Sequence, residues 1–215
     1  MIASVKKYLN ERNVKLIAVS KTKSVDDILT IYKLGQRDFG ENRVKELNEK
    51  RAHLPSDILW HMIGHLQKNK VKYIAPYVHM IQSVDSLDLA TTINKEALKN
   101  KRIINILLQI KIASEDSKSG IDAAELESNI QSFKDLPNLN ISGLMGMGTL
   151  TNDNAITKNE FNKLKKSFDL LKTNHFINDD AFKEISMGMS GDYKIAIECG
   201  STMVRIGSLI FGSRS

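Results

Sequence analysis

The feature that most constrains this chain is the alternation of short apolar runs with helical patterns along all 215 residues. The apolar runs fit buried strands, and strands that alternate with helices predict parallel pairing through right-handed crossovers. Eight such units predict a closed (β/α)₈ TIM barrel, an α/β fold in which residues 1–215 form a single domain; an open doubly wound sheet is the alternative. The expected strands are residues 14–20, 37–39, 58–63, 78–83, 103–111, 139–145, 182–186 and 203–206.

Pairs of polar residues three positions apart mark the starts of two expected helices. Ser24 with Asp27, and Thr157 with Glu160, have the spacing of N-terminal capping pairs. The first pair opens a helix that ends at Gly35, and the second opens a long helix that continues to about residue 173.

Composition excludes several classes of protein. With 41% hydrophobic and 26% charged residues the chain is globular, and its longest apolar runs are too short to span a membrane. The N-terminal segment is charged and lacks the apolar stretch of a secretory signal. Cys199 is the single cysteine, which excludes an intramolecular disulfide framework. We expect a cytoplasmic protein with no membrane partner.

The positive charge of the chain favours small anions over nucleic acid as ligands. The net charge is +6, but the basic residues are spread along the sequence and only 6% of residues are aromatic. We therefore expect no nucleic-acid partner. Because no large apolar face is left over in the pattern, we also expect a monomer. Binding to nucleic acid through the basic surface stays open as a minor alternative.

Lys21 is the first candidate for chemistry, because it follows an apolar run where the first strand leaves the core. In a barrel of this class the functional residues lie at the C-terminal ends of the strands. A lysine among apolar walls has its charged form disfavoured, which makes its amine a nucleophile able to form a Schiff base. A lysine that simply extends into solvent from a strand end is the alternative.

The ends of the last two strands are the second candidate. Residues 186–190 (SMGMS) and 205–208 (RIGS) fall where such barrels bind phosphate, with Ser190 at the start of a short helix. Tight turns would explain the same serines and glycines. His61 and His65 have the spacing of a metal pair, but they fall on a strand end and a turn with no glutamate after His61, so we expect no metal site.

Together these motifs resemble the pyridoxal phosphate homeostasis proteins, which are related to the N-terminal barrel of alanine racemase. The segments that carry the resemblance stand in the same order and cover almost the whole chain. They are residues 18–23 (AVSKTK), 39–43 (FGENR), 60–70 (WHMIGHLQKNK), 117–121 (SKSGI), 143–145 (GLM), 186–190 (SMGMS), 200–207 (GSTMVRIG) and 210–212 (IFG).

The resemblance implies a barrel that holds pyridoxal 5′-phosphate as a Schiff base on Lys21. It places Arg205 opposite the pyridine nitrogen, where a guanidinium that only donates leaves the ring a weak electron sink. By the same resemblance a lysine at 118 takes part in cofactor release or a second binding event. The other residues that it implies are Ser186, Ser190, Gly207 and Ser208 at the phosphate, Asn42 beside the ring, and His61 and His65 on the rim.

Two departures from related proteins shape the expected function. About 13 residues precede the first strand, where the family commonly has a longer helix. We therefore expect a looser closure at the bottom of the barrel, or a trimmed chain start. No β-domain of the kind that supplies a second base in alanine racemases follows Gly212. We expect a non-catalytic carrier of pyridoxal phosphate in vitamin B6 balance, with apo forms of pyridoxal phosphate enzymes as partners. A small amino-acid racemase and a Schiff-base aldolase are the alternatives.

Overall fold

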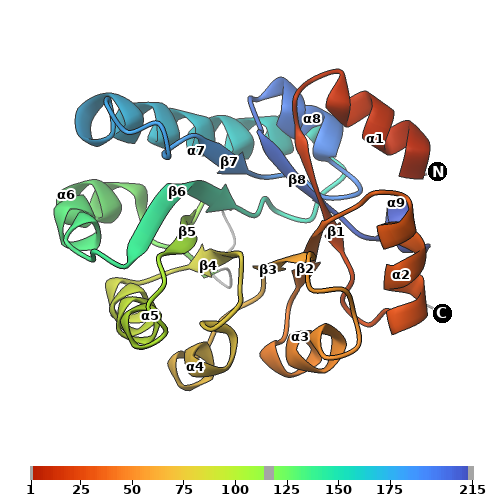
Figure 1. The fold of residues 1–215 in the computed structure, drawn as a ribbon. Coiled ribbons are helices and arrows are strands. Elements are labelled where there is room, and N and C mark those ends of the chain that lie inside the picture. Colours follow the sequence, from red (N-terminus) through yellow and green to blue (C-terminus); the bar gives the residue numbers. More distant parts are fainter. Residues whose placement is uncertain (1, 114–118, 213–215) are drawn as a thin grey trace.

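The computed structural model describes residues 2–113 and 119–212, and within them eight parallel strands close into a barrel in sequence order. β1 pairs with β2 on one side and with β8 on the other, which closes the sheet. Figure 1 shows the strands in the middle of the molecule and the helices around them. The (β/α)₈ prediction is confirmed. The strands are β1 (Lys15–Val19), β2 (Asp38–Glu41), β3 (Leu59–Met62), β4 (Met80–Val84), β5 (Ile104–Ile110), β6 (Leu139–Gly146), β7 (Glu184–Ser186) and β8 (Met203–Ile206).

The helices form the outer layer, and their apolar sides pack on the outward-facing residues of the strands. Among the described residues none of these helices is long and apolar enough to cross a membrane. They are α1 (Ile2–Asn10), α2 (Val25–Lys33), α3 (Val44–Arg51), the 3₁₀ helix η1 (Lys68–Lys70), α4 (Val71–Ile74), α5 (Leu87–Lys99), α6 (Ala123–Lys134), α7 (Asn154–His175), α8 (Tyr193–Glu198) and α9 (Ser208–Phe211).

The residues before β1 form a helix that covers one side of the barrel. Leu9 of α1 is buried in a cluster with Leu16 of β1 and Val204 of β8, on the outer side of these strands. The ring of Tyr8 meets the ring of Tyr193 in α8 edge to face, with centroids 5.9 Å apart. The short segment therefore covers the seam between the first and last strands on the outside of the barrel. The looser closure expected at the bottom of the barrel stays a prediction.

Side chains that point into the barrel are of two kinds. An apolar set packs together in the interior and contains Ile17, Met80, Leu107, Met145 and Met203. Polar side chains occupy inward positions on β3, β4, β7 and β8 and are also fully or almost fully buried; they are His61, Gln82, Ser186 and Arg205. Since alternate residues of a strand face inward, these polar groups lie within hydrogen-bonding reach of one another.

The capping prediction is confirmed at α2 and wrong at α7. Ser24 and Asp27 form a capping box, in which each side chain accepts a hydrogen bond from the other residue's backbone. At α7 the N-cap is Asp153, and Thr157 lies buried one turn inside the helix. Glu160 instead accepts hydrogen bonds from the backbone and hydroxyl of Thr149, so its carboxylate ties α7 to the loop after β6.

Candidate functional site

A cavity of about 450 Å³ opens at the C-terminal ends of the strands, between the loops that follow β1, β2, β7 and β8. The structure brings six of the predicted site residues to its wall, and Met147 and Met189 add apolar surface. A cavity of this size, apolar with a few convergent polar groups, is typical of a small-molecule site. The six residues are Lys21, Asn42, Ser190, Arg205, Gly207 and Ser208.

Lys21 lies in a tight turn directly after β1. The next residue, Thr22, has a φ of +66°, in the left-handed region that a β-branched residue rarely adopts. The turn is closed by the backbone N–H of Lys23, which donates to the carbonyl of Ser20 at 3.0 Å. The backbone N–H of Thr22 donates to the carboxylate of Glu46 in α3, so a neighbouring helix helps to hold the turn.

A buried ion-pair network between α3 and the end of β2 supports this turn. Lys50 of α3 lies 2.8 Å from Glu41 and 2.6 Å from Glu46, and it donates a further hydrogen bond to the carbonyl of Ser20. The hydroxyl of Ser20 donates at 2.6 Å to Oε1 of Glu41, the oxygen to which Lys50 also donates. Burial raises the pKa of Glu41 in spite of these hydrogen bonds. Glu41 and Lys50 are not among the residues predicted from the sequence. The spacing of Glu46 and Lys50, four residues apart on one face of a helix, could have indicated an ion pair.

Arg205 reaches the cavity from inside the barrel and is only 4% exposed. Its guanidinium donates to the carbonyl and hydroxyl of Ser186, at 2.8 and 2.7 Å, and to the carbonyl of Gly146 at 2.9 Å. Burial lowers the pKa of Arg205 to about 10, against the opposing effect of Asp192. The side chain therefore stays a cation near neutral pH, with most of its donors already directed at protein acceptors.

Ser186 does not line the cavity, contrary to its predicted place at a phosphate. It is fully buried, and its hydroxyl donates to Gln82 while it accepts from Arg205. The reason is its position on β7, where its side chain points into the barrel behind Arg205. Ser186 is thus a partner of Arg205, and Ser190 is the serine of this segment that reaches the cavity.

The loops after β7 and β8 are joined at the cavity. The hydroxyl of Ser190 accepts a hydrogen bond from the backbone N–H of Gly207 at 3.3 Å. Gly188 has a φ of +92°, and a Cβ there would lie 2.5 Å from the side chain of Ala196, so only glycine fits this turn. The short helix α8 begins after Asp192 and not after Ser190, which leaves Ser190 in the loop.

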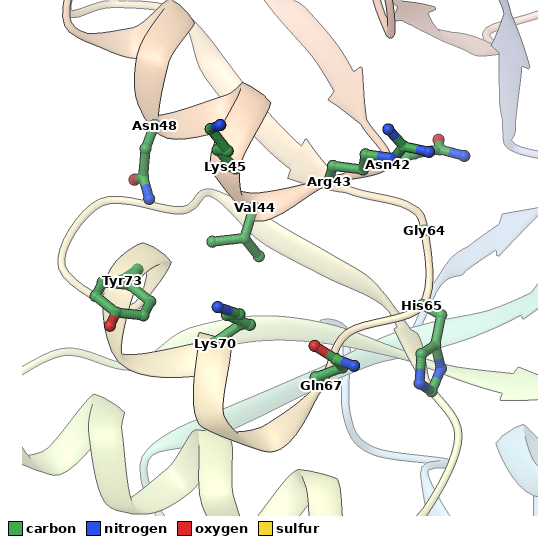
Figure 2. Close-up of a pocket in the computed structure, with 10 residues that line it drawn as sticks. All are labelled: Asn42, Arg43, Val44, Lys45, Asn48, Gly64, His65, Gln67, Lys70 and Tyr73. Atoms are coloured by element: carbon green, nitrogen blue, oxygen red, sulfur yellow. The ribbon is translucent and has the colours of Figure 1, made fainter.

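His65 lies outside this cavity, in a neighbouring one of about 650 Å³ between α3 and the η1–α4 segment (Figure 2). Its side chain is 65% exposed, and its Nδ1 atom lies 3.4 Å from a carboxylate oxygen of Asp85. Asn42 lines both cavities and marks their border. The predicted grouping of His65 with Lys21 is therefore not seen, because the turn after β3 directs His65 away from the barrel axis.

His61 and His65 do not form a metal pair, since His61 is buried inside the barrel. His61 belongs to a different group, in which ligand atoms of Asp38, His61 and His79 lie within 4.8 Å of one another. The Nε2 atom of His61 is 3.0 Å from Asp38 and its Nδ1 atom is 3.1 Å from the Gln82 amide. The residue at 118 lies outside the described residues, and its predicted role is not tested.

Comparisons with known proteins identify the family. Residues 2–215 match the family described as "Alanine racemase, N-terminal domain". Two curated relatives carry the name "Pyridoxal phosphate homeostasis protein". The one from Haemophilus influenzae is 41% identical and the one from Pasteurella multocida is 42% identical, over 96% and 95% of this chain and 87% and 88% of theirs. The chain therefore belongs to the pyridoxal phosphate homeostasis proteins, within the alanine racemase N-terminal domain family.

Solved structures give the same result for the fold. PipY of Synechococcus elongatus without PLP superposes with a TM-score of 0.92 at 35% identity, covering 98% of both chains. PipY with PLP bound superposes with a TM-score of 0.88 at 33% identity, covering 99% of this chain and all of that one. Alanine racemase from Bartonella henselae, at 16% identity and a TM-score of 0.71, shares the fold over 59% of its length.

Proposed function

We propose that this protein binds pyridoxal 5′-phosphate and serves intracellular pyridoxal phosphate balance without catalysing a reaction of its own. The observation that carries the proposal is that Lys21, Arg205 and Ser190 line the same cavity, together with Gly207 and Ser208. The curated relatives named for pyridoxal phosphate homeostasis and the PipY structure with PLP bound support it.

The residues present fit this cofactor. Two lysines line the cavity, and the amine of Lys23 donates to the carbonyl of Phe211 at 3.3 Å, so we propose that the amine of Lys21 takes the aldehyde. The volume of about 450 Å³ is within the usual range for small ligands. Ser190 and Ser208 bring hydroxyl groups to the wall beside Gly207, whose backbone N–H is donated to the Ser190 hydroxyl. Hydroxyl groups of this kind can donate to a phosphate. Asn42 and Met147 line the same cavity.

The chemistry divides between the cofactor and the chain. Pyridoxal phosphate supplies an aldehyde that condenses reversibly with an amine and releases one water. Lys21 presents its amine from a turn that is held by Glu46 and by Lys50 through Ser20. We propose that Arg205 faces the ring nitrogen, where it donates a hydrogen bond and disfavours protonation. A ring so held is a weak electron sink, which favours carriage of the cofactor over catalysis.

Reduction with borohydride followed by peptide mapping tests the proposal. Purified protein loaded with pyridoxal phosphate should show visible absorbance that borohydride removes, and the pyridoxyl group should map to Lys21 and not to Lys23. Lys21→Ala should abolish the trapped adduct, while Lys33→Ala on the exposed face of α2 should keep it. A chain that cannot be loaded, or an adduct that persists in Lys21→Ala, would contradict the assignment.

The absence of catalysis and the partners are separate parts of the proposal. If the protein is a carrier, loaded protein should exchange no α-protons of amino acids in deuterated water, and sustained exchange would favour a racemase instead. We further propose a cytoplasmic monomer that delivers its cofactor to apo-enzymes. Faster activation of an apo-enzyme by loaded protein than by the same concentration of free cofactor would support transfer by contact.

A further inference from the structure

A continuous line of hydrogen bonds crosses the inside of the barrel from Arg205 to Asp38. Arg205 donates to the Ser186 hydroxyl at 2.7 Å, and Ser186 donates to the Oε1 atom of Gln82 at 2.7 Å. The Gln82 Nε2 atom is 3.1 Å from Nδ1 of His61. The other nitrogen of that ring, Nε2, is 3.0 Å from Asp38. The line thus joins the cavity wall to the N-terminal end of β2.

The two ends of this line fix the direction of every hydrogen bond in it. A guanidinium can only donate, so the Ser186 oxygen accepts from Arg205 and its one hydrogen goes to Gln82 Oε1. The NH₂ group of the Gln82 amide then faces His61, whose Nδ1 must accept. The hydrogen of the neutral imidazole is therefore on Nε2, where it is donated to Asp38. Reversing one link would place two donors or two acceptors against each other.

Burial makes each member depend on its neighbours. Ser186, Gln82 and His61 are each 0% exposed, so solvent cannot replace a lost partner. Removing the amide of Gln82 would leave the Ser186 hydroxyl without its acceptor. Ser186 would then turn toward another acceptor, and the lone pair now directed at Arg205 would turn with it.

Asp38 closes the line as a carboxylate. Burial opposes its ionisation, but the hydrogen bond from His61 and the nearby charge of Lys15 hold its pKa below the ordinary value. Burial and the charges of Lys15 and Arg102 act against a proton on His79 and lower its pKa. On the cavity side Asp192 is the carboxylate that acts on Arg205. The line therefore runs from a buried cation to a stabilised anion.

We infer that Gln82 and His61 are positioning residues that hold Arg205 in its place at the cavity through Ser186. Neither residue lines the cavity, and they act by directing the Ser186 hydroxyl, which accepts a hydrogen bond from Arg205. The inference rests on the proposed function, in which Arg205 faces the cofactor ring. It adds residues from β3 and β4 to a site otherwise built by other strands.

The test uses Gln82→Leu and a readout on Arg205 that needs no cofactor. Phenylglyoxal modifies arginines that leave protected positions, and peptide mapping gives the rate at residue 205. We expect Gln82→Leu to raise this rate on the order of tenfold, which corresponds to loss of about one hydrogen bond to a charged group. With cofactor, the same variant should shift the visible absorbance band and weaken binding by a similar factor. Gln82→His should restore both, because an imidazole accepts at one nitrogen and donates at the other.

Gln109→Leu is the matched control, because Gln109 is 3% exposed and its amide donates to the carbonyl of Ser119. It should lower stability as Gln82→Leu does and leave the modification of Arg205 at the wild-type rate. Equal rates in wild type and Gln82→Leu, or equal increases in both leucine variants, would overturn the inference. If wild-type protein cannot be loaded with cofactor, the proposed function fails, and the modification rates still decide this inference.

Discussion

Lys21 and Arg205 both line the cavity, and they are held by different kinds of structure. The Lys21 turn is supported by an ion-pair network, in which Lys50 lies between the carboxylates of Glu41 and Glu46. Arg205 is supported by neutral groups, of which Ser186 is the nearest. The difference follows from where each side chain comes from: Lys21 stands on a loop that needs tying to α3, and Arg205 stands on a strand that already fixes its backbone.

The comparison shows what each support costs. A buried ion pair must offset the desolvation of its charges, and the raised pKa of Glu41 shows that burial outweighs its hydrogen bonds. Neutral acceptors around Arg205 avoid a second buried charge beside it, so the cation stays available to a ligand. The turn that carries Lys21 should therefore be sensitive to removal of one charge from its ion-pair network. The position of Arg205 should be sensitive to a change in which way its neutral partners donate and accept hydrogen bonds.

Lys50→Met should give the largest loss of stability. It leaves the fully buried Glu41 without its cation, which we expect to lower the free energy of unfolding by about 3–5 kcal/mol. Since burial already raises the pKa of Glu41 and Lys50 opposes that rise, the loss should be smallest near pH 4.5 and grow as pH rises and Glu41 must ionise. Urea unfolding at several pH values measures it.

The double variant Glu41→Gln with Lys50→Met is the control for that prediction. It removes both charges, so it should recover much of the stability that Lys50→Met loses and lack the part of the pH dependence that comes from Glu41. If the double variant is no more stable than Lys50→Met, packing by Lys50 and not its charge supports the turn.

Asp38→Asn should have a smaller effect, and its loss of stability should also shrink as pH falls. Asn can still accept from His61, so the variant loses charge but keeps a partner, and we expect a loss of about 1 kcal/mol at neutral pH. Because the folded state lowers the pKa of Asp38, its contribution is present above the ordinary value of 3.8 and disappears as pH falls below it. Thermal unfolding from pH 7 to pH 3 should show the two curves converge, and the exposed Asp180→Asn should follow wild type throughout.

Thr22→Gly should have the smallest effect, and it should be stabilising. The residue after Lys21 has a φ of +66°, which glycine adopts without the crowding of a β-branched side chain. After the entropy cost of glycine we expect a gain of less than about 1 kcal/mol in the free energy of unfolding. Thr30→Gly in α2, where φ is helical, should instead lower stability by a similar amount. Two changes of the same sign would show that the turn carries no strain.

Much of the fold could be predicted because its signals are local. Apolar runs and capping pairs such as Ser24 with Asp27 depend on neighbours in sequence, and parallel pairing then follows from the alternation. The same logic placed Lys21, Asn42 and Ser190 together, since every strand of a barrel ends at the same rim. It failed at α7, where Asp153 competes with Thr157 for the N-cap and only the path of the preceding loop decides between them.

The sequence by itself determined the eight-unit barrel, its family and the rim that carries Lys21 and Arg205. The tertiary structure alone decided which way side chains near that rim face. Ser186 points behind Arg205 and His65 points into a separate cavity, although both stand in motifs beside true cavity residues. It also joined Gln82 and His61 to Arg205. The physical reason is that a hydrogen bond across a barrel links strands far apart in sequence, and no local spacing encodes the closure that brings them together.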